Sequence, residues 1–146
     1  MAAESTANAV WEGDLAHGGG RVAPGSGAFP EQEATWASRT SRSAGKTSPE
    51  ELIAAAHAAC YAMAFSHTLA EGGHAPERVE VSATATFETE GGGPRISTMA
   101  LVVRGRVPGI EESAFQEAAN AAKDGCPVSG ALKGNVEITL DATLES

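Results

Sequence analysis

An alanine-rich segment in the middle of the 146-residue chain restricts the fold more than any other feature. Leu52–Ala70 contains neither glycine nor proline, and alanine has the highest helix propensity of all residues. Thr47-Ser48-Pro49-Glu50-Glu51 precedes it with a capping residue, a proline suited to the first turn and two acidic residues suited to the positive end of the helix dipole. Because Gly72-Gly73 ends the segment, the sequence predicts a long helix from Pro49 to about Ala70.

One face of this helix is expected to pack on the core. The residues that share it at helical spacing are Ile53, Ala56, Cys60, Met63, Ala64 and His67. Cys60 is therefore predicted to lie near the middle of the helix, on its apolar side.

Strands are predicted on both sides of this helix. Polar and apolar residues alternate over Val79–Glu88, and strands are also expected over Ile96–Val107 and Val136–Leu144. Weaker patterns in the Gly- and Ser-rich first 45 residues predict a hairpin of Ala7–Leu15 with Arg21–Ala23. A further short strand is predicted at Thr35-Trp36-Ala37-Ser38-Arg39.

Two more helical segments complete the pattern. Glu111–Lys123 is amphipathic and has Gly125 at its C-cap position, and Pro127 opens a short turn or helix. The chain shows neither an internal repeat nor a linker, and its length suits one domain. We therefore predict a single α+β domain over residues 1–146.

Charge and composition narrow the classes of function. The formal net charge is −9, and no basic cluster is available for phosphates or for an anionic membrane surface. No apolar run is expected to reach the roughly 20 residues of a membrane span. The N-terminus carries Glu4 and lacks the apolar core of a secretory signal. We expect a cytoplasmic protein with no nucleic-acid and no membrane partner.

The two cysteines, Cys60 and Cys126, need an explanation in a compartment that keeps thiols reduced. A structural disulfide would close a loop of about 66 residues and stabilise the fold by a few kcal/mol, but a domain of this size can bury an adequate core without it. Two inert buried thiols and two reactive thiols both remain open. Cys126 lies where one helix ends and Pro127 begins a turn, so it is either a thiol made acidic by a helix N-terminus or a small buried apolar residue.

A reactive Cys60 would need a positive group from elsewhere in the fold. A free thiol has a pKa of about 8.5, and an apolar mid-helix position raises that pKa. Arg39 and Arg42 are the nearest candidates in the sequence, and Glu50 or Glu51 would hold such a guanidinium by a bidentate pair. Taken alone, each arginine is typical of a solvated surface, and each glutamate of a first helical turn.

His57 precedes Cys60 by one helical turn. The pair could share a metal, or the imidazole could assist the thiol. A lone histidine on an apolar helix face is more often a packed core residue, and the chain lacks the four ligands at regular spacing that are typical of zinc sites. We therefore expect His57 to be structural, and we expect neither a metal nor a cofactor.

Several segments of the chain together resemble the OsmC/Ohr family, the osmotically induced protein C and organic hydroperoxide resistance proteins. The segments that carry the resemblance are Trp11-Glu12-Gly13-Asp14, Thr47-Ser48-Pro49-Glu50-Glu51-Leu52-Ile53, Ala55-Ala56-His57-Ala58-Ala59-Cys60, Gly125-Cys126-Pro127-Val128-Ser129 and Val136-Glu137-Ile138-Thr139-Leu140. The third of these and Val107-Pro108-Gly109-Ile110 look more like the OsmC branch than the Ohr branch.

This resemblance implies a fold, an activity and roles for four residues. The fold would be antiparallel strands around a long central helix, in an intertwined homodimer with active sites near the subunit interface. The activity would be that of a thiol peroxidase that prefers organic hydroperoxides to hydrogen peroxide. Cys60 matches the peroxidatic cysteine, Cys126 the resolving cysteine that forms a disulfide with it, and Glu50 the glutamate that orients a thiolate-stabilising arginine. Arg39 is the first choice for that arginine, and Arg42 is the second.

The resemblance also implies a thiol reductant, such as a lipoylated protein or a dithiol. A non-catalytic protein that binds a lipid or another apolar ligand would have the same apolar surroundings of Cys60, so it is the main alternative. A disulfide-exchange catalyst is a weaker alternative, because the chain has no Cys-x-x-Cys pair.

Overall fold

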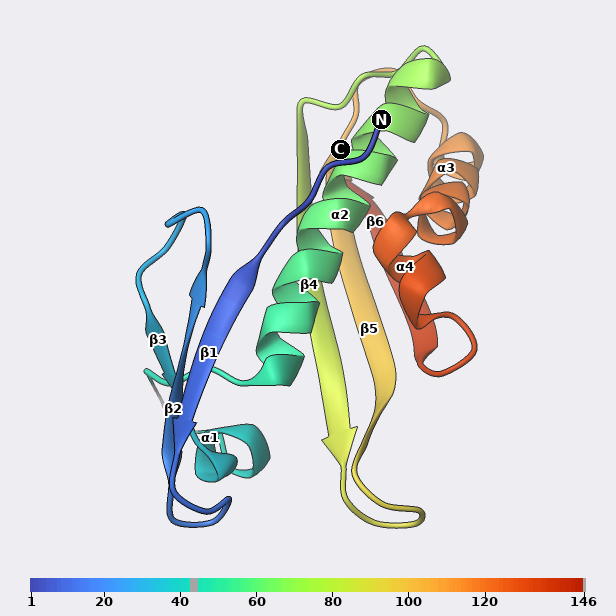
Figure 1. Cartoon of the computed structure of the whole chain (residues 1–146). Helices are drawn as coiled ribbons and strands as arrows, with labels where there is room; N and C mark the ends of the chain where they lie inside the picture. The colour runs from blue at the N-terminus through green and yellow to red at the C-terminus, as the bar shows by residue number, and fades with distance from the viewer. Residues whose placement is uncertain (43–44, 146) are drawn as a thin grey trace. The chain divides into compact units, whose positions relative to one another are not determined.

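The computed structural model describes residues 1–42 and 45–145, which form two compact units, Met1–Leu52 and Ile53–Ser146. Each unit contains a three-stranded sheet (Figure 1). The long helix α2 (Pro49–Glu71) begins in the first unit and continues into the second, so it is the one element that belongs to both.

The first unit is an antiparallel sheet followed by a short helix. Its strands β1 (Ala7–Glu12), β2 (Gly19–Pro24) and β3 (Gln32–Ala34) lie in the order β1-β2-β3. The predicted hairpin is confirmed, with Ala7 opposite Pro24 and Glu12 opposite Gly19. The strand β3 was not predicted, because three residues are too few to show alternation.

The strand predicted over Thr35–Arg39 is wrong, because this segment forms the helix α1 (Trp36–Thr40). A capping box begins the helix: the N–H of Ser38 donates to the Thr35 hydroxyl at 3.0 Å, and the N–H of Thr35 donates to the Ser38 hydroxyl at 2.9 Å. These side-chain hydrogen bonds satisfy the first backbone donors of a helix, so local capping outweighs the strand propensity of tryptophan and threonine.

The helix α2 agrees with its prediction in extent but only in part in orientation. Ser48 caps it, accepting a hydrogen bond from the N–H of Glu51 at 3.1 Å. Of the predicted core face, Ile53, Cys60 and Ala64 pack against the core, whereas Ala56, Met63 and His67 are exposed. The buried residues are Glu50, Ala54, His57, Tyr61, Phe65 and Leu69. Alanine on every face gives a weak periodicity, and the aromatic rings decide which face is buried.

The second unit is a mixed sheet with helices on one face. Its strands β4 (Arg78–Glu88), β5 (Arg95–Arg106) and β6 (Glu137–Glu145) lie in the order β4-β5-β6. β4 and β5 are antiparallel, but β5 and β6 are parallel, so the expectation of purely antiparallel strands is wrong for this pair. The cause is the helical connection through α3 (Glu112–Gly125) and α4 (Pro127–Leu132), since a long crossover brings the chain back in the same direction.

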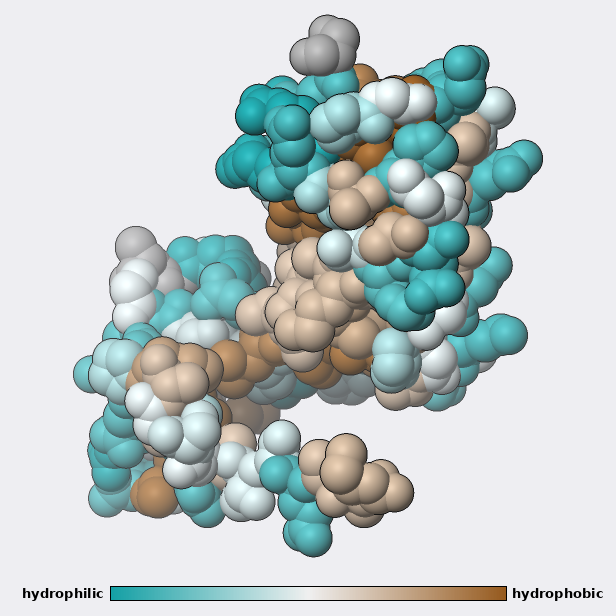
Figure 2. Space-filling model, turned by 90° about the horizontal axis from the view of Figure 1, so that it is seen from above, coloured by the Kyte–Doolittle hydropathy of each residue, from teal (hydrophilic) through white to brown (hydrophobic). Residues whose placement is uncertain are grey.

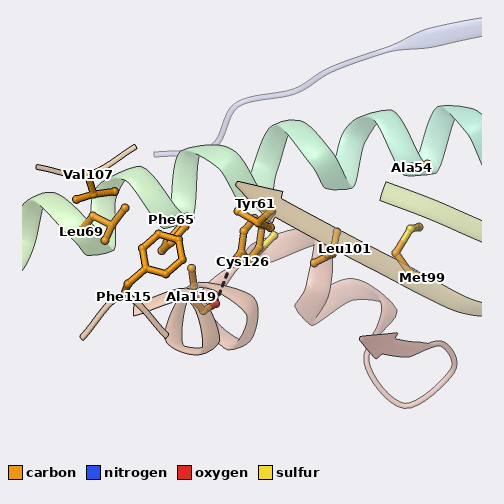
Figure 3. Close-up of a cluster of buried hydrophobic side chains, with 12 residues drawn as sticks. Ala54, Tyr61, Phe65, Leu69, Met99, Leu101, Val107, Phe115, Ala119 and Cys126 are labelled. Atoms are coloured by element: carbon orange, nitrogen blue, oxygen red, sulfur yellow. Dashed lines mark hydrogen bonds between the residues drawn. The ribbon is translucent and has the colours of Figure 1, made fainter. Parts of the chain in front are cut away.

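The core of the second unit joins α2, β5 and α3 (Figure 3). Its largest buried side chains are Tyr61, Phe65 and Leu69 of α2, Met99, Leu101 and Val103 of β5, and Phe115 of α3. The rings of Phe65 and Phe115 meet edge to face with centroids 5.3 Å apart. Gly105 allows this packing, because a Cβ at this position would lie 2.8 Å from the Phe115 ring. The core therefore holds the middle of α2 in place.

By length and composition alone, α2 could also cross a membrane. Its 23 residues include an 18-residue window of mean hydropathy 1.3, of which 22% is buried in this structure. The expectation that no apolar run reaches such a length is therefore wrong, because the many alanines of α2 make this window apolar on average. The core helix of a soluble protein passes the same test, so the absence of a membrane partner stays a prediction.

Candidate active site

The structure brings the four predicted site residues together as two pairs. Cys60 and Cys126 form one pair in the second unit, and Arg39 and Glu50 form the other pair in the first unit. Each pair joins residues that are distant in the sequence.

Cys60 and Cys126 are free thiols that interact with each other, since each shifts the pKa of the other. Cys60 lies midway along α2 and is half-buried, whereas Cys126 is 1% exposed and is the residue that precedes α4. The turn from α3 into α4 positions Cys126: its backbone N–H closes α3 by donating to the carbonyl of Ala122, and its own carbonyl accepts from Gly130 in α4. The prediction that this thiol lies at a helix junction is confirmed.

The surroundings of the two sulfurs shift their pKa values in opposite directions. Burial raises the pKa of the Cys60 thiol, the Cys126 sulfur raises it further, and the N–H of Val128 opposes them. Burial also pushes the pKa of Cys126 upward, but the N–H of Ser129 and the side chains of Cys60 and Ser129 outweigh it and hold that pKa below the ordinary value. Within one chain, Cys126 is therefore the more acidic thiol.

Arg39 and Glu50 form a bidentate ion pair. The Arg39 Nε lies 3.0 Å from Glu50 Oε1 and its Nη2 lies 2.9 Å from Oε2. The Glu50 side chain is 2% exposed and that of Arg39 is 31% exposed, so the carboxylate is buried and the guanidinium still reaches the surface. The Arg39 guanidinium also lies 5.9 Å from the centre of the Trp36 ring, which is close enough for a cation–π contact.

Arg42, the second candidate, makes a different set of contacts. Its Nη2 lies 3.2 Å from Glu51 Oε2, and its Nη1 donates to the Ser48 hydroxyl at 3.2 Å. Both side chains of the Arg42–Glu51 pair are more than half exposed, at 56% and 52%. Arg39 is thus the arginine that a buried carboxylate fixes in place, and Arg42 is a surface arginine near the cap of α2.

An apolar pocket of about 480 Å³ lies beside Arg39 in the first unit. Its apolar walls are formed by Val10, Trp11, Leu15, Val22, Trp36 and Leu52. A pocket of this size and polarity suits an alkyl chain or another apolar group.

Sequence reasoning did not single out Ser129. Its hydroxyl lies 2.8 Å from Nε2 of the fully buried His57, and its side chain also lowers the pKa of Cys126. The expectation that His57 is a packed, hydrogen-bonded core residue is confirmed. A serine one turn after a cysteine has no signal of its own, and its partner is 72 residues away, so only the fold reveals this contact.

Among residues 1–42 and 45–145, no group of three or more His, Cys, Asp or Glu side chains is placed to hold a metal ion. The described site consists of two free thiols beside the long helix of an α+β fold, together with the hydrogen-bonding groups around them, and thiols are the groups that thiol–disulfide exchange requires.

Comparison with known proteins identifies the family. The family model described as "OsmC-like protein" matches residues 42–141. Peroxiredoxin OsmC of Escherichia coli is 41% identical over 146 residues, the whole of both chains. The organic hydroperoxide resistance protein OhrB of Bacillus subtilis is 33% identical over 96 residues, which are 65% of this chain and 68% of OhrB.

Solved structures agree with the sequence matches. The crystal structure of OhrB of Bacillus subtilis superposes with a TM-score of 0.72 and 27% identity, over 94% of this chain and 98% of that chain. The chain belongs to the OsmC family, and the longer and closer match to OsmC than to OhrB places it in the OsmC branch. The resemblance found in the sequence is therefore confirmed.

Proposed function

We propose that this protein is a cysteine-dependent peroxidase that reduces organic hydroperoxides, and hydrogen peroxide less well. The observation that carries the proposal is the pair of interacting free thiols, Cys60 and Cys126. It is supported by a relative of equal length, 41% identical, that is named a peroxiredoxin, and by relatives named for organic hydroperoxide resistance. The protein is thus a peroxidase-type enzyme.

The two sulfur atoms carry out the reaction in two steps. The Cys60 thiolate attacks the distal oxygen of the hydroperoxide, the O–O bond breaks, and the alkoxide leaves and takes up a proton to become an alcohol. Cys60 is then a sulfenic acid. The Cys126 sulfur attacks the Cys60 sulfur, an S–S bond forms, and water leaves. An external thiol reductant, a dithiol or a lipoylated protein, returns two electrons to the disulfide.

The first step needs a Cys60 thiolate, which one chain alone does not favour. Burial and Cys126 raise the pKa of Cys60, so a positive group must oppose them. The Arg39–Glu50 pair is the candidate, but Glu50 and Cys60 are ten residues apart on one helix, about 15 Å along its axis. We therefore assign the stabilising guanidinium to Arg39 of a second copy of the chain in a homodimer.

The surface of the single chain supports such a homodimer. Most of the apolar window of α2 is not buried, and Met63 is 71% exposed on it. In the first unit, Val10, Trp11 and Leu15 are also exposed beside the Arg39 pocket. Figure 2 shows apolar side chains reaching the surface in both units. A second copy would cover these apolar areas and bring its Arg39 to Cys60.

The pocket beside Arg39 indicates the class of peroxide. Its walls are mostly apolar, so they favour the alkyl group of an organic hydroperoxide over the small and polar hydrogen peroxide. The Arg39 guanidinium at the wall would face both the thiolate and the peroxide oxygens. A reductant that is kept in the cytoplasm would complete the cycle, and we place the protein in that compartment.

Titration with cumene hydroperoxide, followed by mass spectrometry, tests the proposal. One equivalent is expected to remove two hydrogen atoms from the chain and to link Cys60 to Cys126. Cys60→Ser is expected to abolish peroxide consumption. Cys126→Ser is expected to allow a first turnover and then to leave Cys60 open to sulfinic and sulfonic acid formation. Full activity of the Cys60 variant would end the proposal.

A protein that binds an apolar ligand without catalysis is the second candidate, and the 480 Å³ pocket favours it. The same titration separates the two. An unchanged mass after cumene hydroperoxide, together with saturable binding of a fatty acid that Trp36→Ala weakens, would support the binding protein.

A further inference from the structure

His57 is a buried polar side chain that the reaction proposed above does not use. It is 0% exposed, and its Nε2 lies 2.8 Å from the hydroxyl oxygen of Ser129. Its other ring nitrogen, Nδ1, is buried without a hydrogen-bond partner. Burial lowers the pKa of His57, so the ring is neutral at neutral pH. Burying a polar ring this deep in a core lowers the stability of the fold, so we expect the one hydrogen bond that the ring makes to have a role.

The contact lies beside the two thiols. His57 precedes Cys60 by one turn of α2, and Ser129 follows Cys126 by one turn of α4. The His57–Ser129 hydrogen bond therefore joins the same two helices as the Cys60–Cys126 contact does. It holds α4 to α2 at the level of the sulfur atoms.

The same serine acts on Cys126. The side chain and the backbone N–H of Ser129 both lower the pKa of the Cys126 thiol. A hydroxyl has a single hydrogen, so once that hydrogen is donated to sulfur, the Ser129 oxygen is left as an acceptor for Nε2–H of His57. In this tautomer Nδ1 carries only a lone pair, which explains how it can remain buried without a partner.

We propose that His57 is a positioning residue for disulfide formation: through Nε2–H it orients the Ser129 hydroxyl, which donates to the Cys126 sulfur and prepares it to attack oxidised Cys60. This role rests on the peroxidase function proposed above. In the step itself the Cys126 thiolate attacks the Cys60 sulfur, the S–O bond breaks, and the departing hydroxide takes up the proton that Cys126 released, giving water. His57 and Ser129 keep their protons throughout.

Other charged and titratable groups near this network are few. Cys60 and Tyr61 of α2 interact with Cys126, and the Tyr61 hydroxyl donates to the carbonyl of Ala119. Lys123, Asp124 and Lys133 line a pocket that includes Ser129. Of these groups, only Cys60 is changed in the variants below, and that change is present in both proteins that the alkylation experiment compares, so a difference in Cys126 chemistry between them reports on the His57–Ser129 contact.

Two measurements test the role. In a Cys60→Ser background, the pH profile of Cys126 alkylation is followed with and without Ser129→Ala, and its midpoint is expected to rise by about one pH unit, a tenfold loss of thiolate. The second measurement uses Ser129→Ala in the protein that keeps both cysteines. After rapid mixing with cumene hydroperoxide, this variant is expected to form the disulfide about tenfold more slowly than the unaltered protein and to accumulate more over-oxidised Cys60, while the first oxidation step is unchanged. His57→Phe is expected to act in the same way as Ser129→Ala, and His57→Gln, which can still donate, is expected to recover most of the loss.

Ser97→Ala is the matched control, because the Ser97 hydroxyl is also buried but has no hydrogen-bond partner. Unchanged alkylation and disulfide formation in Ser129→Ala would overturn the role, even if His57→Phe does not fold. A His57→Phe effect that His57→Gln does not recover and Ser129→Ala does not share would also overturn it, since it would reflect packing alone. If the unaltered protein consumes no peroxide, the peroxidase function fails, while the alkylation profile still decides whether His57 and Ser129 act on Cys126.

Discussion

At the scale of single residues, the contrast between two neighbouring ion pairs decides which arginine is fixed. Arg39 holds a carboxylate that is 2% exposed, whereas Arg42 holds one that is 52% exposed. A buried carboxylate that loses its partner has no water to replace it, but an exposed one does. Replacing the arginine is therefore expected to destabilise the protein strongly in the Arg39 pair and only slightly in the Arg42 pair.

Replacing Arg39 by Gln is expected to lower the free energy of unfolding by about 3 kcal/mol, because it leaves the Glu50 charge buried and unpaired. The double variant Arg39→Gln with Glu50→Gln removes both charges and is expected to cost only about 1 kcal/mol. Urea denaturation followed by circular dichroism measures both.

Arg42→Gln is the matched control and is expected to change the stability by less than about 1 kcal/mol. An equal loss in the Arg39 and Arg42 variants would contradict the assignment of a buried pair to Arg39. So would a double variant that is no more stable than Arg39→Gln alone.

The sequence pointed to Arg39, Glu50, Cys60 and Cys126 and to an arginine–glutamate pair, but it left open which arginine and which glutamate form the buried pair. The capping pattern Thr47-Ser48-Pro49-Glu50-Glu51 placed the two glutamates in the first turn of α2, where either could hold an arginine. The two glutamates differ in burial, since Glu50 is buried and Glu51 is exposed. This difference depends on tertiary packing, which the local sequence pattern does not contain. Ser129 is the extreme case, since its role is visible only through His57.

At the scale of helices and strands, cap signals were more informative than periodicity. Ser48 and Pro49 predicted the start of α2 correctly, whereas only half of the residues that the apolar periodicity placed on its core face pack against the core. Periodicity also failed to predict α1, which begins with a capping box formed by two short polar side chains at Thr35 and Ser38. The parallel pairing of β5 and β6 could not be predicted from the strands themselves, because it follows from the helical crossover between them.

Gly105 gives a prediction for the packing of α3 on β5. Gly105→Ala is expected to destabilise the protein by about 1–3 kcal/mol, because the new Cβ would lie 2.8 Å from the Phe115 ring in a filled core. Thermal unfolding measures the loss. Gly130→Ala in α4 is the control: nothing lies within 4 Å of its added Cβ, so it is expected to be neutral or to stabilise by up to about 1 kcal/mol. A Gly105 variant as stable as the Gly130 variant would show that Phe115 can move aside.

At the scale of the whole molecule, the thiol pair and the arginine pair belong to different compact units. The sequence predicted the hairpin of the first sheet but not its third strand, and the prediction of a single domain stays a prediction. In the proposed homodimer, each copy would supply the cation that the other copy's Cys60 needs. Apolar side chains exposed in both units are the surface that such pairing would bury.

Mixed dimers test whether Arg39 acts across the two copies. The chain with Arg39→Gln and Glu50→Gln lacks the cation, and the chain with Cys60→Ser lacks the peroxidatic thiol, so each homodimer is expected to be inactive toward cumene hydroperoxide. A heterodimer, isolated with two different affinity tags, contains one complete site if Arg39 serves the other copy's thiol, and about half of the wild-type activity per dimer is expected. If Arg39 serves the thiol of its own chain, no complete site forms and the heterodimer is as inactive as its parents.

The homodimer with Arg42→Gln is expected to keep full activity, which distinguishes the two arginines. A protein that is monomeric by light scattering at assay concentration and still fully active would exclude the shared site altogether.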